Sequence, residues 1–382
     1  MNLDLPIYLD NAATTKLAPE VLTKMLPYLT DYYGNPASTH SFGKIASSAV
    51  EEARLNVAKT VGCDFKEIIW TSGATEASNL AIIGASSFYK SRGKHLITLT
   101  TEHKATLDTL NNLEKEGFSV TYLTPNQNGL LNLADLISAI QADTILVSIA
   151  FVNSELGVIQ NIAEIGKICH KYSIILHVDA AQAVGKVAFD LSKLHVSLMS
   201  FSAHKVYGPK GIGALYVRRH PRVRLKALIH GGGHERGFRS GTLATHQIVG
   251  MGEAFKLASA TFHEDFLQIK NLYNILLNGI KNIPGSFING DITNRVPHNI
   301  NVGFKNINAN DLIKHMVDSI IISTGSACSS ALLEPSYVLK AIGLSDELAS
   351  SSIRITLGKF NTIEEINFVV KYLYESVIKL QQ

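Results

Sequence analysis

A lysine at the end of a predicted strand is the first residue of this chain whose position suggests covalent chemistry. The short apolar run Ser197–Phe201 is followed by Ser202, His204 and Lys205, and a glycine-punctuated turn then leads to a second apolar run, Ala214–Val217. Loss of hydration at the end of a buried strand lowers the pKa of an amine, and a deprotonated amine can form a Schiff base. We hypothesise that Lys205 is such an amine; the alternative is a solvated lysine at a strand end.

An acid ends the strand that precedes this lysine in the sequence. Asp179 closes the segment His177-Val-Asp179, and Gln182 follows three residues later. A carboxylate here could pair with the protonated nitrogen of a pyridine cofactor that acts as an electron sink. It could also cap a helix, because two alanines come next. The residues leave both interpretations open.

Two further strand ends carry polar groups. Ser72–Thr75 joins a predicted strand to a predicted helix, so its backbone N–H groups and the Thr75 hydroxyl could hold a phosphate at a helix N-terminus. His103 follows another strand and could stack on a flat ring or move protons, or simply be a surface histidine. Turns of this kind are common, so neither feature is specific by itself.

Short apolar strands alternate with amphipathic helices through the first two thirds of the chain. This pattern predicts an α/β fold with a mostly parallel sheet covered by helices on both faces, and such sheets bind ligands at the carboxyl ends of their strands. We expect strands at 67–71, 95–99, 119–123, 144–150, 174–179 and 197–201, and helices at 47–61, 72–83, 104–116, 132–140 and 162–172.

The pattern changes after Thr245 to two helical windows and then shorter strands and helices. A capping box at Thr362–Glu365 begins the last predicted helix. We expect a large domain over 16–257, a small α+β domain over 258–382, and an N-terminal segment, 1–15, that joins them.

The composition points to a cytoplasmic protein. The 382 residues carry a net charge of +3, and no apolar run approaches the ~20 residues needed to span a bilayer. We expect no membrane association. Direct nucleic-acid binding is not expected either, because the basic segment 218–226 lacks aromatic residues that could stack on bases. That segment is a solvated surface or an attractor of acidic partner proteins.

The three cysteines are far apart and form no CxxC pair, so the sequence predicts neither a disulfide framework nor an intrinsic metal site. Cys169 lies in an amphipathic window and is expected in the core, and Cys63 follows a helix without a nearby partner. Cys328 lies in the small-residue segment 324–330, which is typical of a mobile loop. A lone cysteine is either a buried structural thiol or a reactive one, and nothing in that polar segment would bury Cys328.

Taken together, these motifs resemble the pyridoxal-phosphate-dependent cysteine desulfurases of the IscS and NifS type, which have the class-V aminotransferase fold (fold type I). The similarity extends from about residue 5 to 380. It is carried by Tyr8–Thr15, Thr71–Glu76, Thr101–His103, His177–Asp179 with Gln182, Ser202–Lys205 and Gly325–Ser329.

The resemblance implies a role for each site residue. Lys205 would form the Schiff base with pyridoxal phosphate, Asp179 would pair with the pyridine nitrogen, and His103 would stack on the ring. Arg354 would bind the substrate carboxylate. Gln182 and Asn153 would approach the ring oxygen or the substrate; Ala74, Thr75, Ser202 and His204 would hold the phosphate; Thr242 would reach the phosphate of the other subunit in a homodimer.

The implied reaction is conversion of L-cysteine to L-alanine. Lys205, helped by His103, would move a proton, and Cys328 would take the sulfur as a persulfide and pass it to an acceptor. Acceptors implied are an iron–sulfur scaffold protein, with which Cys328 would transiently ligate a cluster, or a tRNA-thiolation protein.

Two departures from the family pattern are visible. Ala203 stands where the family often has glycine, and the chain ends at Gln382, where many members continue into a scaffold-docking tail. Rival interpretations are a class-V aminotransferase, a selenocysteine lyase, and a catalytically idle docking partner. Cys328 argues against an aminotransferase, and an intact Lys205 with Asp179 argues against an idle protein.

Overall fold

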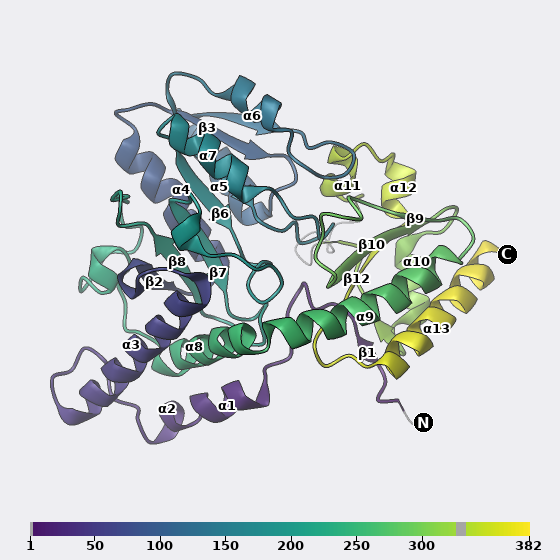
Figure 1. Ribbon diagram of the computed structural model, residues 1–382, viewed down its shortest axis with the longest axis horizontal. Coiled ribbons are helices and arrows are strands. Elements are labelled where there is room, and N and C mark those ends of the chain that lie inside the picture. The colour runs from purple at the N-terminus through teal and green to yellow at the C-terminus, as the bar shows by residue number, and fades with distance from the viewer. Residues whose placement is uncertain (1–2, 326–333) are drawn as a thin grey trace.

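The computed structural model describes residues 3–325 and 334–382 and contains a seven-stranded sheet as its largest element (Figure 1). Its strand order is β2-β8-β7-β6-β5-β3-β4, and only β8 runs antiparallel to its neighbours. The predicted mostly parallel sheet is therefore confirmed. The strands are β2 (Ile68–Thr71), β3 (His95–Leu99), β4 (Ser119–Leu123), β5 (Thr144–Ala150), β6 (Ile175–Asp179), β7 (Leu198–Ser202) and β8 (Gly213–Val217).

Helices cover both faces of this sheet, because successive residues of each strand point to opposite sides. Ile69 and Leu96 pack in one apolar core with α4 (Ala74–Tyr89) and α5 (Lys104–Lys115). Their neighbours Trp70 and Ile97 belong to the opposite core. That core also holds apolar residues of α3 (Ser41–Val61), α7 (Ile162–Lys171) and α8 (Thr245–Ala260). Cys169 is buried there, as the sequence predicts.

A second structural region lies at the C-terminal side of the molecule (Figure 1). Here an antiparallel sheet has the order β12-β10-β9, and β1 pairs with β11 in parallel. Ile7 and Leu9 from the N-terminal segment join the apolar core of this region. The elements are β1 (Ile7–Tyr8), α9 (Phe262–Lys281), β9 (Ser286–Ile288), β10 (Asn299–Phe304), α10 (Ala309–Met316), β11 (Ile320–Ile321), α11 (Tyr337–Ala341), α12 (Asp346–Ser350), β12 (Ser352–Thr356) and α13 (Ile363–Gln381).

Most differences from the sequence expectations concern short elements. Helix α3 begins at Ser41 rather than at 47, because the His40 ring nitrogen Nδ1 accepts a hydrogen bond from Gly43 N (3.3 Å) and caps the helix. The chain also forms α1 (Pro19–Met25) and α2 (Pro27–Thr30), which were not predicted, whereas α6 (Leu133–Ala139) matches the helix expected at 132–140. In the part of the chain that the structure describes, no helix is both long and apolar enough to cross a membrane.

The limits of the two proposed domains stay a prediction.

Candidate active site

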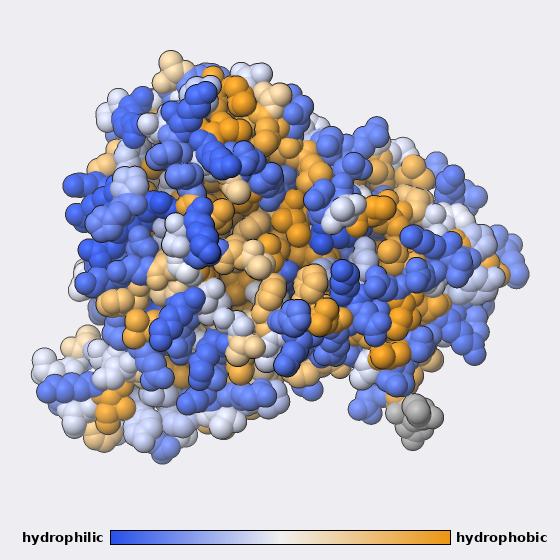
Figure 2. Space-filling view, in the orientation of Figure 1, coloured by the Kyte–Doolittle hydropathy of each residue, from blue (hydrophilic) through white to orange (hydrophobic). Residues whose placement is uncertain are grey.

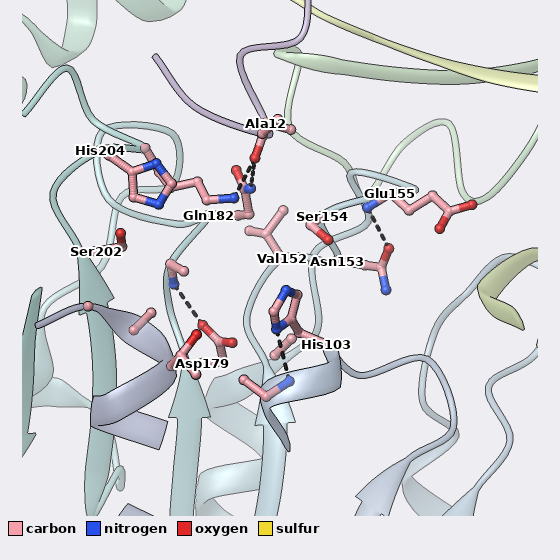
Figure 3. A pocket seen from close by; sticks show the side chains of 18 of the residues that line it. Ala12, His103, Val152, Asn153, Ser154, Glu155, Asp179, Gln182, Ser202 and His204 are labelled. Atoms are coloured by element: carbon pink, nitrogen blue, oxygen red, sulfur yellow. Dashed lines mark hydrogen bonds between the residues drawn. The ribbon is translucent and has the colours of Figure 1, made fainter. Parts of the chain in front are cut away.

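A cavity of about 420 Å³ lies at the carboxyl edge of the large sheet, where the strand-end residues meet (Figure 3). This volume is in the range of small-molecule and cofactor sites. Figure 2 shows apolar residues gathered at the centre of one face, within a mainly polar surface. Ten of the predicted site residues line the cavity: Ala74, Thr75, His103, Asn153, Asp179, Gln182, Ser202, His204, Lys205 and Arg354.

The start of helix α4 forms an anion-binding cradle in this cavity. Gly73 precedes the helix, and no described side chain caps its first turn. A β-carbon added to Gly73 would meet open space, so the backbone here faces room for a ligand. Glu76 fixes the turn instead, because its Oε2 accepts a hydrogen bond from Ser72 N (2.8 Å). The first N–H groups of a 16-residue helix are thus directed to a site suited to an anion.

Asp179 and Lys205 face the same cavity from neighbouring strands. Asp179 ends β6, and its Oδ1 accepts a hydrogen bond from Ala181 N (2.9 Å), which orients the carboxylate (Figure 3). Lys205 lies in the turn after β7, and its Nζ donates to the Ala12 carbonyl (2.6 Å). The N-terminal segment therefore supplies a group that holds the lysine, a role that the sequence does not reveal.

His103 is the N-cap residue of helix α5. Its Nδ1 accepts a hydrogen bond from Ala105 N (3.1 Å), which leaves the ring proton of the neutral form on Nε2 (Figure 3). Burial lowers the pKa of His103; the charge of Asp179 opposes this shift and that of Lys205 adds to it. The imidazole is consequently neutral near pH 7 and can accept or relay a proton. Burial, followed by the charges of Lys205 and two other lysines, lowers the pKa of His204 to about 4.

Arg354 lies on β12 and reaches the cavity from the second region. Its guanidinium is buried, donates to Asp10 Oδ1 (2.6 Å) and donates to the Ser154 carbonyl (3.2 Å). Within the described residues its Nε has no hydrogen-bond partner. An unsatisfied buried donor on a planar fork is a suitable partner for a ligand carboxylate.

The Asn153 side chain forms hydrogen bonds with backbone groups of the protein. Its Nδ2 donates to the Thr101 carbonyl (3.0 Å), and its Oδ1 accepts from Glu155 N (3.0 Å) and Leu156 N (2.9 Å). The neighbouring Glu155 also lines the cavity, and burial raises the pKa of its carboxyl group to about 7. A hydrogen bond from Ser336 and the charge of Arg354 oppose that rise.

The remaining two predicted site residues are Thr242 and Cys328. Thr242 is exposed after the turn that precedes α8 and does not line the cavity. Cys328 lies outside the described residues. Sequence reasoning missed Asp10, Ala12, Glu155 and Lys186, and only the acidic start of the Asp10–Thr15 motif offered a signal.

The chain matches the family model of the class-V aminotransferases over residues 7–369. It therefore belongs to that family, whose fold and strand-edge site it shares.

Comparison with individual proteins narrows the assignment. Cysteine desulfurase IscS of Dechloromonas aromatica (strain RCB) is 58% identical over 384 residues, which cover 100% of this chain and 95% of the relative. A solved structure of a NifS-like protein is 36% identical with a TM-score of 0.93, covering 98% of this chain and 100% of that one. A solved structure of SspA in complex with cysteine is 38% identical with a TM-score of 0.83, covering 93% and 100%. Within its family the chain belongs to the cysteine desulfurases of the IscS and NifS type.

Proposed function

We propose that this enzyme converts L-cysteine to L-alanine with pyridoxal phosphate as cofactor and captures the sulfur on Cys328. The observation that carries the proposal is the convergence of an amine, an acid, a neutral histidine and an arginine fork on one cavity. The similar solved structure of SspA is in complex with cysteine, which supports the choice of substrate.

The residues around the cavity fit pyridoxal phosphate. The uncapped first turn of α4 with Thr75, Ser202 and His204 would hold the phosphate, and Asp179 would face the pyridine nitrogen. Lys205 would attach the cofactor covalently, and His103 would lie against the ring. When bound, the cofactor supplies an electron sink for the pair of electrons left at the substrate α-carbon.

The side chains of this chain would then carry out the remaining work. Arg354 would bind the substrate carboxylate through the N–H that lacks a partner among the described residues. The Lys205 amine would take the proton from the α-carbon, and neutral His103 would relay protons at its ring nitrogen. The Cys328 thiolate would attack the substrate sulfur. The new S–S bond replaces the substrate C–S bond, whose electrons and an added proton complete alanine.

The fate of the sulfur is the next part of the proposal. The curated relatives are named cysteine desulfurase IscS, which supports delivery to iron–sulfur cluster assembly. We assign a homodimer, in which the exposed Thr242 would reach the partner subunit's phosphate site. Delivery for tRNA thiolation and a cytoplasmic location stay predictions from the sequence.

The test is to incubate the purified enzyme with pyridoxal phosphate, L-cysteine and a thiol reductant and to measure alanine and sulfide in the same samples. Equal amounts of the two products are expected, because each turnover releases one of each. Absence of both from protein that shows cofactor absorption would refute the proposal.

Cys328→Ala separates the sulfur-transfer chemistry from direct elimination. We expect this variant to keep the cofactor absorption of the wild type and to lose at least ~99% of alanine formation, as is usual when a nucleophile is removed. Cys63→Ala, at a half-buried thiol that does not line the cavity, is the matched control and should keep full activity. Full activity of Cys328→Ala would indicate a lyase instead.

A further inference from the structure

A second lysine, Lys186, lies directly behind the cavity wall. Its Nζ donates a hydrogen bond of 2.6 Å to Oε1 of Gln182, which itself lines the active-site cavity. Lys186 also borders a separate cavity of about 20 Å³ together with Lys205. The two lysines thus share the lining of this small cavity, and the chemistry described above uses only Lys205.

The bond from Lys186 gives the Gln182 amide a single orientation. Oε1 faces the Lys186 amine, and Nε2 donates to the Ala12 carbonyl at 2.8 Å (Figure 3). A reversed amide would set its NH2 group against the lysine and its oxygen against the Ala12 oxygen, so both hydrogen bonds would be lost. The Gln182 side chain is therefore held with its N–H group, and not its oxygen, toward Ala12.

The orientation of the Gln182 amide affects Lys205 because both side chains bind the Ala12 carbonyl. The Ala12 carbonyl accepts from both Gln182 Nε2 (2.8 Å) and Lys205 Nζ (2.6 Å). When Lys205 turns to a cofactor or a substrate, the Gln182 amide keeps a partner on each side only because Lys186 holds its oxygen.

We propose that Lys186 is a positioning residue for the desulfurase reaction, acting through Gln182. It holds the amide so that Nε2, and not Oε1, faces the cavity-lining Ala12, where Gln182 would offer a hydrogen-bond donor to the cofactor. The inference rests on the proposed function and extends it to a residue that touches neither cofactor nor substrate.

The surroundings of Lys186 argue against a purely structural role. Lys186 is partly buried and, within the described residues, has no carboxylate partner within ion-pair distance; withdrawing an amine from water without such a partner lowers stability. Burial lowers the pKa of Lys186 to about 7, and the charges of Lys205 and Arg354 act in the same direction. Besides the two lysines, the charged or titratable residues that line the small cavity are Tyr207, Asp265, His298 and Lys359. A lysine kept here at the expense of stability is explained by its bond to Gln182.

The decisive experiment compares Lys186→Met, Gln182→Leu and the double variant. Methionine preserves the length of the side chain and removes the donor and the charge. We expect Lys186→Met to lower kcat/KM about tenfold, or about 1.4 kcal/mol, and to raise the pH midpoint of the cofactor absorption change by about one unit. Its free energy of unfolding in urea, measured without cofactor, should stay equal or increase.

The double variant tests the route of the effect. If Lys186 acts through Gln182, Lys186→Met adds nothing to Gln182→Leu, because the intermediary is already gone. Lys193→Met, at a side chain that is 80% exposed, is the matched control and should behave like the wild type. Additive losses, or a Lys186→Met enzyme indistinguishable from the wild type, would overturn the proposal.

A cofactor-free measurement separates this inference from the function on which it rests. In crystal structures of cofactor-free protein, Gln182 Nε2 is expected within 3.5 Å of the Ala12 carbonyl in the wild type and displaced or doubly oriented in Lys186→Met. An unmoved amide in that variant would refute the positioning role. Absence of alanine formation by the wild type would instead refute the proposed function.

Discussion

At the scale of single residues, the site is supported by a buried neutral histidine. His177 lies two residues before Asp179 on the same strand. Its two ring nitrogens are within hydrogen-bond distance of the hydroxyls of Ser148 and Ser200 (2.8 Å each). Its ring is fully buried, and this burial lowers its pKa from 6.5 to about 3. The stability of strand β6, which ends at Asp179, thus depends on the imidazole of His177 staying uncharged.

This shift predicts how stability depends on pH. Because the pKa of His177 is lower in the folded than in the unfolded protein, the unfolded chain binds a proton first as the pH falls below 6.5, and stability decreases down to about pH 3. Between pH 7 and 5 this residue should account for about 2 kcal/mol of lost unfolding free energy. His177→Gln should reduce the loss measured by urea unfolding at the two pH values. The exposed His263→Gln is the control, and an unchanged pH dependence of His177→Gln would contradict the assignment.

At the scale of elements, a buried ion pair joins helix α3, strand β2 and the glycine-rich loop before α8. Both nitrogens of the Arg54 fork donate to Glu235, at 2.8 and 2.9 Å, and Trp70 N donates to the same carboxylate (2.8 Å). Arg54 and Glu235 are both buried. Loop, helix and strand are therefore fixed together next to the anion-binding cradle that begins at the end of β2.

Glu235→Gln should test this connection. The glutamine oxygen can still accept from Trp70 N, but it leaves the buried Arg54 charge without its main partner, so we expect a loss of about 3–5 kcal/mol in urea unfolding. Adding Arg54→Met should recover part of that loss, since no uncompensated charge remains. If the two losses simply add, the two side chains do not act as a pair.

At the scale of the whole molecule, the N-terminal segment links the two apolar cores to the site. Leu9 is completely buried in the core of the C-terminal region, and the next residue, Asp10, pairs with Arg354 (2.6 Å). Two residues further, the Ala12 carbonyl receives Lys205 and Gln182. We therefore infer that the packing of Leu9 positions Arg354, Lys205 and Gln182 through Asp10 and Ala12. The predicted division at residues 257 and 258 is untested, and we keep it as a proposal.

Leu9→Ala should therefore affect both stability and substrate binding. We expect a loss of about 2–5 kcal/mol in unfolding free energy from the cavity, together with a higher KM for L-cysteine as Arg354 loses its orientation. Leu5→Ala is the control, because Leu5 belongs to the same segment but is 49% exposed and should change stability by less than about 0.5 kcal/mol. A destabilised Leu9→Ala enzyme with an unchanged KM would show that the segment does not position the site.

The sequence by itself determined the sheet and the position of its functional edge. Lys205, Asp179, His103 and Thr75 all follow apolar strands, and the parallel-strand pattern requires such residues to meet at one edge. Alternation of apolar residues is a local property, so it can be recognised without knowing the fold. Short elements such as α11 and α12 carry too few residues for any period to be visible.

Only the tertiary structure decided which distant groups complete the site. Asp10 and Arg354 are 344 residues apart in the sequence. The Ala12 carbonyl, a group that any residue could supply, accepts a hydrogen bond from Lys205, which is 193 residues away. Lys186 is four residues from Gln182, yet the sequence does not show that its amine is buried against that amide. Hydrogen bonds of this kind depend on how the two cores pack against each other, and the local periodicity of a sequence does not encode that approach.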